Sequence, residues 1–439
     1  MSKIIVVGAG INGVTSAIEL KKRCHDVVLV DPGPLPHALA ASTDISKAVR
    51  AAYGADEDYT SLAERSIKLW RQWNEEFASK LYHEVGVMFV RRRKMEPGDF
   101  EYESFNLLEK RGLNVARMNS PELWKRFPAW NPELYRDGVF EIDAGYAESG
   151  RAVAMLIERA KSIGVELRTG SRFVCLDEAD DRVKGIVIAE RQHSAVIPSE
   201  AKRSRRCNAE DEVREARLST PQQSSELTQR GPSTSLGMTR IAADTVVMAV
   251  GAWTPYLLPF TGKFFRATGQ PVFHLRPSEP ELFESERFPV FGADITTTGY
   301  YGFPINRDGI VKIANHGAGR EMSPDSPERV VTADNERNLR EFLASTFSSL
   351  ADAPIVYTRV CMYCDTHDGH FWIAPDPDRE GLVVAAGDSG HGFKFAPVLG
   401  EIIADAVEGK ENPLLDKFRW RPEVDAGTAT DAARSKAKL

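Results

Sequence analysis

A glycine-rich turn close to the start of the chain constrains the fold more than any other feature of this sequence. The turn reads Gly-Ala-Gly-Ile-Asn-Gly, and its glycines are Gly8, Gly10 and Gly13. It follows the nearly continuous apolar run Lys3–Val7, which is typical of a strand buried on both faces. Apolar residues at helical spacing in 14–23 predict a helix, and residues 27–30 predict a second buried strand that ends at Asp31.

This strand, turn, helix and strand predict a dinucleotide-binding site. In such a site the first glycine permits a tight turn, the second lets the backbone approach a pyrophosphate, and the third lets the helix pack on the strand. The helix N-terminus offers N–H groups and a positive dipole to phosphates. Asp31 can accept hydrogen bonds from ribose hydroxyls, and an acid at this position disfavours a 2′-phosphate.

Two later glycine turns favour FAD over NAD as the dinucleotide. The apolar strand 246–250 ends at a turn that contains Gly251 and Trp253. A second apolar strand, 381–386, runs into a turn and then into a helix over 398–407, and the glycines of that turn are Gly387, Gly390 and Gly392. These turns suit a second approach to the flavin ring and the ribityl chain of one cofactor.

Composition excludes several other classes of protein. A chain of 439 residues, 42% of them hydrophobic, is long enough for two closely packed domains. A net charge of −7 argues against a nucleic-acid partner, and no apolar run approaches the ~18 residues that a membrane span needs. The N-terminus lacks an export signal, so we expect a cytoplasmic protein without a membrane partner. The cysteines are too few and too scattered for a disulfide framework: Cys24, Cys175, Cys207, Cys361 and Cys364.

The segment 191–239 does not fit the pattern of its surroundings. It loses apolar periodicity and is rich in Arg, Ser, Gln, Glu and Pro, whereas strong strand sequence stands on both sides at 183–189 and 241–250. A hairpin turn usually takes about 2–5 residues. We therefore predict a solvated, disordered insertion in a hairpin turn that the chemistry does not need. The alternative is a regulatory or docking element with a basic N-terminal half.

Three motifs in the C-terminal third make the prediction more specific: Cys361-Met-Tyr363, His370-Phe371 and Ser389-Gly-His-Gly-Phe-Lys-Phe395. With them, the chain resembles the sarcosine oxidase and fructosyl-amino-acid oxidase (amadoriase) family within the D-amino-acid-oxidase-like fold. The similarity covers nearly the whole chain apart from 191–239. The segment 43–50, with Tyr53-Gly54, and the segment 419–422 look closer to the fructosyl-amino-acid and pipecolate/saccharopine oxidase branch.

We accordingly predict an α/β (α+β) fold of two domains, with the catalytic pocket between them. One is a Rossmann-like βαβ domain that binds FAD, and the other is an antiparallel β-sheet domain that binds substrate. The FAD-binding domain is expected to be discontinuous and to comprise 1–80, 140–260 and 355–439. The substrate-binding domain is expected to comprise 81–139 and 261–354.

The resemblance implies that Cys361 holds the flavin covalently. It matches the cysteine that forms a thioether to the 8α-methyl group of FAD in this family, by addition of a thiolate to an electrophilic flavin methide. From the residues alone, a buried structural thiol is the alternative, and Cys361-x-x-Cys364 could also be a redox pair or half of a zinc site. No second pair of metal ligands accompanies it, so we predict no metal.

The resemblance also implies a substrate site. Arg50 and Lys394 match the pair that holds the substrate carboxylate, and two converging cations suit a planar anion. Lys394 lies between two phenylalanines in a glycine-rich turn, so idle exposure is disfavoured, whereas a single Arg or Lys is more often a solvated charge. Three further residues match positions that line the pocket, namely Tyr301, His316 and Tyr363. His316 could instead be a loop histidine with a satisfied ring.

Lys312 is a charge inside the apolar strand 310–313. Burying an unpaired ammonium group is costly, so the side chain should face a cavity or a partner, unless it points to solvent. In the family, the matching lysine lies beside the flavin N5 and activates oxygen. Two departures weaken the case for sarcosine itself, because Lys47 stands where sarcosine oxidases carry a second arginine and Thr43 where monomeric ones carry a histidine.

The predicted reaction is hydride transfer from the carbon beside a secondary amine to flavin N5, followed by imine hydrolysis and reduction of O₂ to hydrogen peroxide. The substrate could be sarcosine, a cyclic imino acid, a fructosyl amino acid or an iminodicarboxylate, and the enzyme a monomer. A dehydrogenase that passes electrons to a quinone or carrier protein is one alternative, and a flavin-binding protein without turnover is another. Besides the glycines above, the expected FAD contacts are Asp31, Ser42, Thr43, Lys47, Val174, Trp253, Cys361, Phe393 and Lys394.

Overall fold

The computed structural model describes residues 1–190, 237–422 and 433–435. Its first large element is a six-stranded sheet in the order β20-β21-β13-β1-β2-β9, in which every neighbouring pair is parallel except β20 and β21. The strands are β1 (Lys3–Val7), β2 (Asp26–Asp31), β9 (Glu166–Thr169), β13 (Thr245–Met248), β20 (Trp372–Pro375) and β21 (Leu382–Ala386).

This sheet is buried on both faces, which is why β1 is apolar along its length. Successive strand residues point to opposite faces. Ile4 and Val6 therefore pack in the cluster that includes the helices α1 (Ile11–Lys22), α5 (Ser149–Ser162) and α9 (Ala396–Glu408). Ile5 and Val7 pack in a second cluster, together with the three-stranded sheet β10 (Ser171–Ala179), β11 (Arg182–Glu190) and β12 (Met238–Ala242). The predicted Rossmann-like domain is confirmed.

The strands on either side of the 191–239 segment form a hairpin. β11 pairs antiparallel with β12, with Ala189 opposite Met238. Met238 and Thr239, the last two positions of the predicted insertion, belong to β12. Residues 191–236 lie outside the described residues, so the insertion itself stays a prediction.

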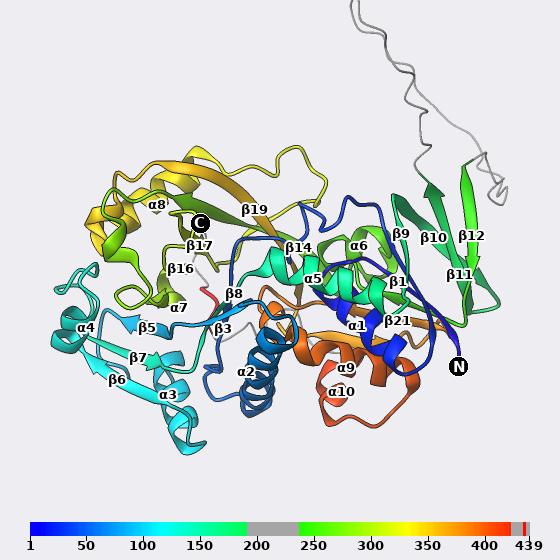
Figure 1. The fold of residues 1–439 in the computed structure, drawn as a ribbon, viewed down its shortest axis with the longest axis horizontal. Helices are drawn as coiled ribbons and strands as arrows, with labels where there is room; N and C mark the ends of the chain where they lie inside the picture. The colour runs from blue at the N-terminus through cyan, green and yellow to red at the C-terminus, as the bar shows by residue number, and fades with distance from the viewer. Residues whose placement is uncertain (191–236, 423–432, 436–439) are drawn as a thin grey trace, which may run out of the picture.

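The second large element is a nine-stranded sheet on the left of Figure 1. Eight strands follow the order β18-β14-β17-β16-β15-β5-β7-β6, and β19 pairs with β14. The sheet is mixed and not purely antiparallel, because β15 and β5 pair in parallel. Its strands are β5 (Val87–Arg91), β6 (Val115–Asn119), β7 (Asp137–Glu141), β14 (Phe265–Leu275), β15 (Val290–Ala293), β16 (Tyr300–Phe303), β17 (Val311–Asn315), β18 (Arg320–Glu321) and β19 (Ile355–Thr366).

An aromatic-rich core holds this second sheet against its helices. Phe273, Phe291 and Phe347 are fully or almost fully buried in it, together with Leu339 and Phe342 of α8 (Ala333–Thr346). A small sheet of β3 (Lys47–Val49), β8 (Gly145–Ala147) and β4 (Tyr82–Glu84) lies between the two large elements (Figure 1). The remaining helices are α2 (Glu57–Glu76), α3 (Phe100–Lys110), α4 (Ser120–Arg126), α6 (Thr254–Leu257), α7 (Ile295–Thr298) and α10 (Pro413–Phe418).

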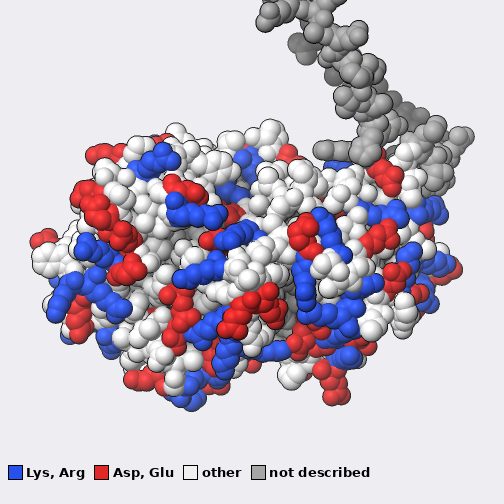
Figure 2. Space-filling view, viewed as in Figure 1, with Lys and Arg blue, Asp and Glu red and all other residues white. Residues whose placement is uncertain are grey.

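The predicted fold class is confirmed, whereas the division into residue ranges stays a prediction. Strand β19 begins at Ile355, inside a range expected for the FAD domain, yet it pairs with β14 of the second sheet along its whole length. Positive and negative side chains are interspersed on the face seen in Figure 2. No helix among the described residues is long and apolar enough to cross a membrane.

Candidate active site

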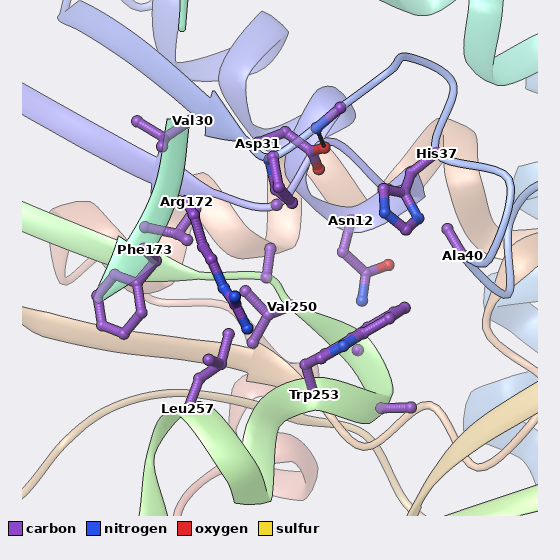
Figure 3. A pocket seen from close by; sticks show the side chains of 18 of the residues that line it. Asn12, Val30, Asp31, His37, Ala40, Arg172, Phe173, Val250, Trp253 and Leu257 are labelled. Atoms are coloured by element: carbon purple, nitrogen blue, oxygen red, sulfur yellow. Dashed lines mark hydrogen bonds between the residues drawn. The ribbon is translucent and has the colours of Figure 1, made fainter. Parts of the chain in front are cut away.

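A cavity of about 690 Å³ lies at the carboxyl ends of β1 and β2, where α1 begins. Pockets for cofactors and comparable ligands occupy about 300–1,000 Å³. Figure 3 shows Asp31 and Asn12 on one side of this cavity, and Val250, Trp253 and Leu257 on the other. Crevices at the carboxyl ends of parallel strands are the usual binding sites of open α/β sheets.

The glycine turn brings the backbone to the floor of this cavity. Gly8 has φ of +98°, which L-residues rarely adopt, and a Cβ on it would lie 2.5 Å from the carbonyl oxygen of Ala249. A Cβ on Gly13 would lie 1.8 Å from the carbonyl oxygen of Gly8, so only glycine lets α1 pack this closely on the turn. Gly10 is the N-cap residue of α1 and has no side chain that could cap the helix, so the backbone at the helix N-terminus faces the cavity.

Asp31 and Ser42 fix the rim of the cavity. The Asp31 carboxylate accepts hydrogen bonds from the backbone N–H of Ala9 at 2.9 Å and of Gly33 at 2.8 Å. The Ser42 hydroxyl accepts one from the N–H of Ile11 at 3.0 Å. A carboxylate has about four lone-pair sites. Asp31 can therefore hold the turn and still accept from a ribose hydroxyl.

Buried polar atoms around the cavity fit a polar ligand. Within the described part of the chain, Asn12 Oδ1, His37 Nδ1 and Thr43 Oγ1 are buried without a hydrogen-bond partner. Such atoms are usually satisfied, because leaving one unpaired costs about 1–3 kcal/mol. Asn12 and His37 line the cavity, and the indole of Trp253 contacts the His37 ring edge-on at 5.7 Å. The donor and acceptor set therefore suits a dinucleotide.

The structure distributes the expected FAD contacts unevenly. The large cavity is lined by Gly8, Gly10, Asp31, Ser42, Gly251 and Trp253. A second, smaller cavity is lined by Lys47, Gly390, Phe393 and Lys394. Neither cavity is lined by Gly13, Thr43, Val174, Cys361, Gly387 or Gly392. The side chain of Val174 is 40% exposed, and its neighbours Arg172 and Phe173 line the large cavity instead (Figure 3).

The smaller cavity, of about 70 Å³, gathers most of the expected substrate-binding residues. It is lined by Arg50, Tyr301, His316, Tyr363 and Lys394, together with Lys47. Three cations therefore line it, and none of the lining residues in the described chain is a carboxylate. Of the expected catalytic residues, Lys312 alone does not line it. This cavity is electrostatically suited to a small anion.

Lys394 is held rigidly against α2. Its backbone carbonyl accepts hydrogen bonds from Ser66 Oγ at 2.5 Å and from Trp70 Nε1 at 2.8 Å. Its Nζ donates to the hydroxyl of Tyr53 and to the carbonyl of His391, both at 2.7 Å. These contacts come from α2, from the loop before it and from the turn that contains Gly390 and Gly392. The side chain of Lys394 is almost fully buried, and its ammonium group has a fixed position.

Arg50 is fixed by aromatic rings and by the chain that follows it. Its guanidinium carbon lies 4.7 Å from the ring centre of Tyr53, and its Nη1 donates to the carbonyl of Ala52. The carboxylate of Glu141 accepts from the N–H groups of Ala51 and Ala52, at 2.6 and 3.1 Å. Burial raises the pKa of Glu141 to about 7, against the effect of these bonds and of the Arg50 charge.

Strand β19 separates the two cavities. Met362 and Cys364 line the large cavity, whereas Tyr363 lines the small one, as alternation along a strand requires. Cys361 points to the same side as Tyr363, into an apolar cluster that also contacts Ala41 of the large cavity and Tyr301 of the small one. The two cysteines therefore lie on opposite faces of the strand, which is incompatible with a redox pair or a shared metal site.

Polar contacts connect Cys361 and Tyr363 to their surroundings. Lys47 Nζ lies 3.5 Å from Cys361 Sγ, and the Tyr363 hydroxyl lies 3.2 Å from His316 Nδ1. Burial opposes the charge on Lys47, but the Cys361 sulfur and the Asp44 carboxylate keep its pKa above the ordinary value. Burial raises the pKa of Tyr301 to about 12, so this phenol is neutral at physiological pH.

Lys312 has a partner that sequence reasoning did not identify. Its Nζ donates to Asp44 Oδ2 at 2.7 Å and to the carbonyl of Ser46 at 2.5 Å, and it lies 4.6 Å from the ring centre of Phe303. Burial lowers the pKa of Lys312 to about 8. Burial also opposes the charge on Asp44, but Lys312 and His274 hold the pKa of this carboxyl well below its usual range.

Two arginines that the sequence did not single out hold the loop at the rim of the large cavity. Arg359 donates to the carbonyls of Ala38, Ala40 and Thr43, and Arg329 donates to that of Leu39 at 2.7 Å. Both lie far from this loop in the sequence. Arg359 stands two positions before Cys361, but this place in the sequence does not reveal such contacts, and Arg329 gave no signal.

The fold and the two cavities define a flavin-dependent enzyme. The chain belongs to the family of FAD dependent oxidoreductases (DAO), whose model matches residues 3–406. The chain is 28% identical over 421 residues to the monomeric sarcosine oxidase of Bacillus sp. (strain B-0618), and the match covers 94% of both chains. It is 27% identical over 451 residues to the L-saccharopine oxidase of Schizosaccharomyces pombe, over 96% of this chain and 94% of the relative.

Solved structures show the same fold. The fructosamine oxidase Amadoriase II from Aspergillus fumigatus, described as a deglycating enzyme, superposes with a TM-score of 0.74 at 23% identity, over 96% of this chain and 90% of that chain. The fructosyl peptide oxidase from E. terrenum superposes with a TM-score of 0.77 at 20% identity, over 99% and 96%. The predicted resemblance to the sarcosine oxidase and fructosyl-amino-acid oxidase family and the assignment to FAD-dependent enzymes are confirmed.

Proposed function

We propose that this protein is an oxidase of small N-substituted amino acids and that it forms hydrogen peroxide. The observation that carries the proposal is the small cavity, which Lys394 and Arg50 both line and which no carboxylate among the described residues lines, beside a cavity that fits the dinucleotide. The named activities of the relatives, which include sarcosine and saccharopine oxidation, support a substrate with a carboxylate beside a secondary amine. The monomeric state and the cytoplasmic location stay predictions.

Each residue of the small cavity has a role in this proposal. Lys394 and Arg50 bind the substrate carboxylate by charge-assisted hydrogen bonds. The pair formed by His316 and Tyr363 fixes the wall against which the N-substituent lies. Residues of the glycine turns and of the rim hold FAD, which supplies the hydride acceptor when it is bound.

The size of the small cavity favours a small substituent on nitrogen. A cavity needs a volume of about 10–15 Å³ to hold one water molecule, so a cavity of 70 Å³ holds about five to seven groups of the size of water. Sarcosine, with about six non-hydrogen atoms, is of this size, whereas a fructosyl amino acid or an iminodicarboxylate is much larger. On size we therefore place sarcosine or a small cyclic imino acid ahead of the larger candidates, although Lys47 and Thr43 depart from the sarcosine oxidases.

A peroxide assay on the holoenzyme over sarcosine, L-pipecolate, fructosyl-glycine and saccharopine tests the proposal. We expect peroxide from at least one of the first two. Bleaching of the flavin by a substrate without peroxide in air would instead indicate a dehydrogenase. The ion pair between Lys312 and Asp44 favours this second candidate, because the carboxylate offsets the positive charge that would assist oxygen. No reaction with any of the four would refute both.

We further propose that Cys361 attaches FAD covalently. Its sulfur lies beside Lys47 and between the two cavities. After precipitation with acid, the yellow colour is expected to stay with the protein pellet in the wild type and to move to the supernatant in Cys361→Ser. Cys364→Ser is the matched control, because this thiol lies on the same strand and lines the large cavity. If flavin moves to the supernatant only in Cys364→Ser, then Cys364 and not Cys361 is the site of attachment.

A further inference from the structure

A short C-terminal segment, residues 433–435, is buried behind the small cavity. It is drawn in red near the middle of Figure 1, between the two large sheets. Ala433 is fully buried in the core cluster that also contains Phe89 and Phe393, two residues that line this cavity. Arg434 is 9% exposed and Ser435 is 3% exposed. Long polar side chains are rarely buried to this extent unless they have specific partners.

Arg434 joins the chain after His316 to the strand that carries Tyr363. Its Nη1 and Nη2 donate to the two carboxylate oxygens of Asp365 at 2.6 and 2.7 Å. Its Nε donates to the carbonyl of Gly317 at 2.9 Å. Asp365 follows Tyr363 by two positions, so both side chains point to the same face of β19. The guanidinium carbon itself lies 5.6 Å from the ring centre of Tyr363.

Ser435 adds a second attachment at the same place. Its backbone N–H donates to the carbonyl of His316 at 3.0 Å, and its hydroxyl donates to the carbonyl of Thr297 at 3.0 Å. Neither Arg434 nor Ser435 is among the residues that line the small cavity. Each contacts one residue that does: Arg434 lies over the ring of Tyr363, and Ser435 bonds to the backbone of His316. His316 and Tyr363 share a hydrogen bond.

We propose that Arg434 is a positioning residue that fixes the His316–Tyr363 wall and thereby limits the size of the N-substituent that the cavity accepts. The bidentate pair with Asp365 has a set geometry, because a guanidinium fork matches a carboxylate in only a few orientations. A wall that is held at the backbone of His316 and beside Tyr363 cannot retreat to admit a larger group. The inference rests on the proposed function, since it concerns the same cavity.

Binding of two carboxylic acids of different size tests the inference without turnover. Acetate and benzoate are titrated separately into oxidised holoenzyme, and binding is followed by the absorbance of the flavin. The wild type should prefer acetate, and Arg434→Met should reduce this preference about tenfold or more. Arg434→Lys keeps the charge but not the fork, so its preference for acetate should lie between those of the wild type and of Arg434→Met. With sarcosine and L-pipecolate as substrates, Arg434→Met should change the ratio of the two kcat/KM values in favour of L-pipecolate, the larger substrate.

Arg421→Met is the matched control. Arg421 is also buried and also forms a bidentate pair, with Asp368, but within the described residues none of its hydrogen bonds reaches a residue that lines either cavity. The preference of the Arg421→Met variant for acetate over benzoate should stay within about twofold of that of the wild type. Equal losses in Arg434→Met and Arg421→Met would refute the inference, because they would reflect general loosening.

A second pair of variants covers the case in which Arg434→Met does not fold. Ser435→Ala removes the hydroxyl that bonds to Thr297 and keeps the N–H that bonds to His316, whereas Ser435→Pro removes both, so the two variants differ in the bond to His316. A reduced preference in the proline variant alone supports the inference, and an unchanged preference in both contradicts it. A wild type that binds neither acid would refute this inference together with the proposed function. An unchanged preference in Arg434→Met would refute the inference alone.

Discussion

Replacing Lys394 with methionine is expected to raise the KM for the amino-acid substrate about 10- to 100-fold, while kcat falls less. Hydrogen bonds to charged groups contribute about 1.5–3 kcal/mol, and a factor of ten corresponds to about 1.4 kcal/mol. Lys394 is buried and held by Tyr53 and His391, so its ammonium group has a fixed position at the cavity. Steady-state kinetics with the best substrate of the panel measures the effect.

The control for this prediction is Lys417→Met. Lys417 also lies over a tyrosine ring, 4.9 Å from the ring centre of Tyr59, and it also binds carboxylates, but it lines neither cavity. The KM of the Lys417→Met variant should stay within about twofold of that of the wild type. Lys394→Arg should recover part of the loss, because it restores the charge. An unchanged KM in Lys394→Met would exclude this lysine from carboxylate binding.

The dinucleotide-binding half could be predicted because its determinants are local. The spacing of Gly8, Gly10 and Gly13 dictates how closely the backbone packs, and in the structure a Cβ on Gly13 would overlap the carbonyl of Gly8. The unbroken apolar run of β1 reflects burial on both faces of a parallel sheet. Neighbouring residues are enough to specify such features.

The substrate site depended on resemblance, because its residues are far apart in the sequence. Arg50 and Lys394 line one small cavity although they are 344 positions apart (394 − 50) in the sequence, and no periodicity relates them. Val174 shows the limit of such a transfer, since Arg172 and Phe173 line the cavity instead. Contacts that come from tertiary packing alone, such as those of Arg434 with Asp365, left no trace that the sequence could reveal.

Lys312 shows how far a physical argument can reach without a structure. The cost of burying an ammonium group implied a partner, but not which one. Asp44 was open to inference, because it lies between Thr43 and Lys47, two residues already expected near the flavin. What the sequence could not show is that the pair is closed at 2.7 Å, with Lys312 1% exposed.

Replacing Lys312 with methionine is therefore expected to have two separate effects. The first is a loss of stability of about 3–5 kcal/mol, because removal of one partner leaves the Asp44 carboxylate buried without its nearest cation. Thermal or denaturant unfolding of the holoenzyme measures it. The double variant Lys312→Met with Asp44→Asn should regain most of this stability, since it removes the buried charge as well.

The second effect is on oxygen. If Lys312 assists its reduction, both the single and the double variant should recover their oxidised absorbance about 10²- to 10³-fold more slowly when substrate-reduced enzyme is mixed with air-saturated buffer. This is the loss typical of removing one preorganised electrostatic group. Because burial lowers the pKa of Lys312 to about 8, the wild-type rate should fall as the pH rises through 8, where the cation is lost. A double variant that is stable and reoxidises at the wild-type rate would assign Lys312 a structural role alone.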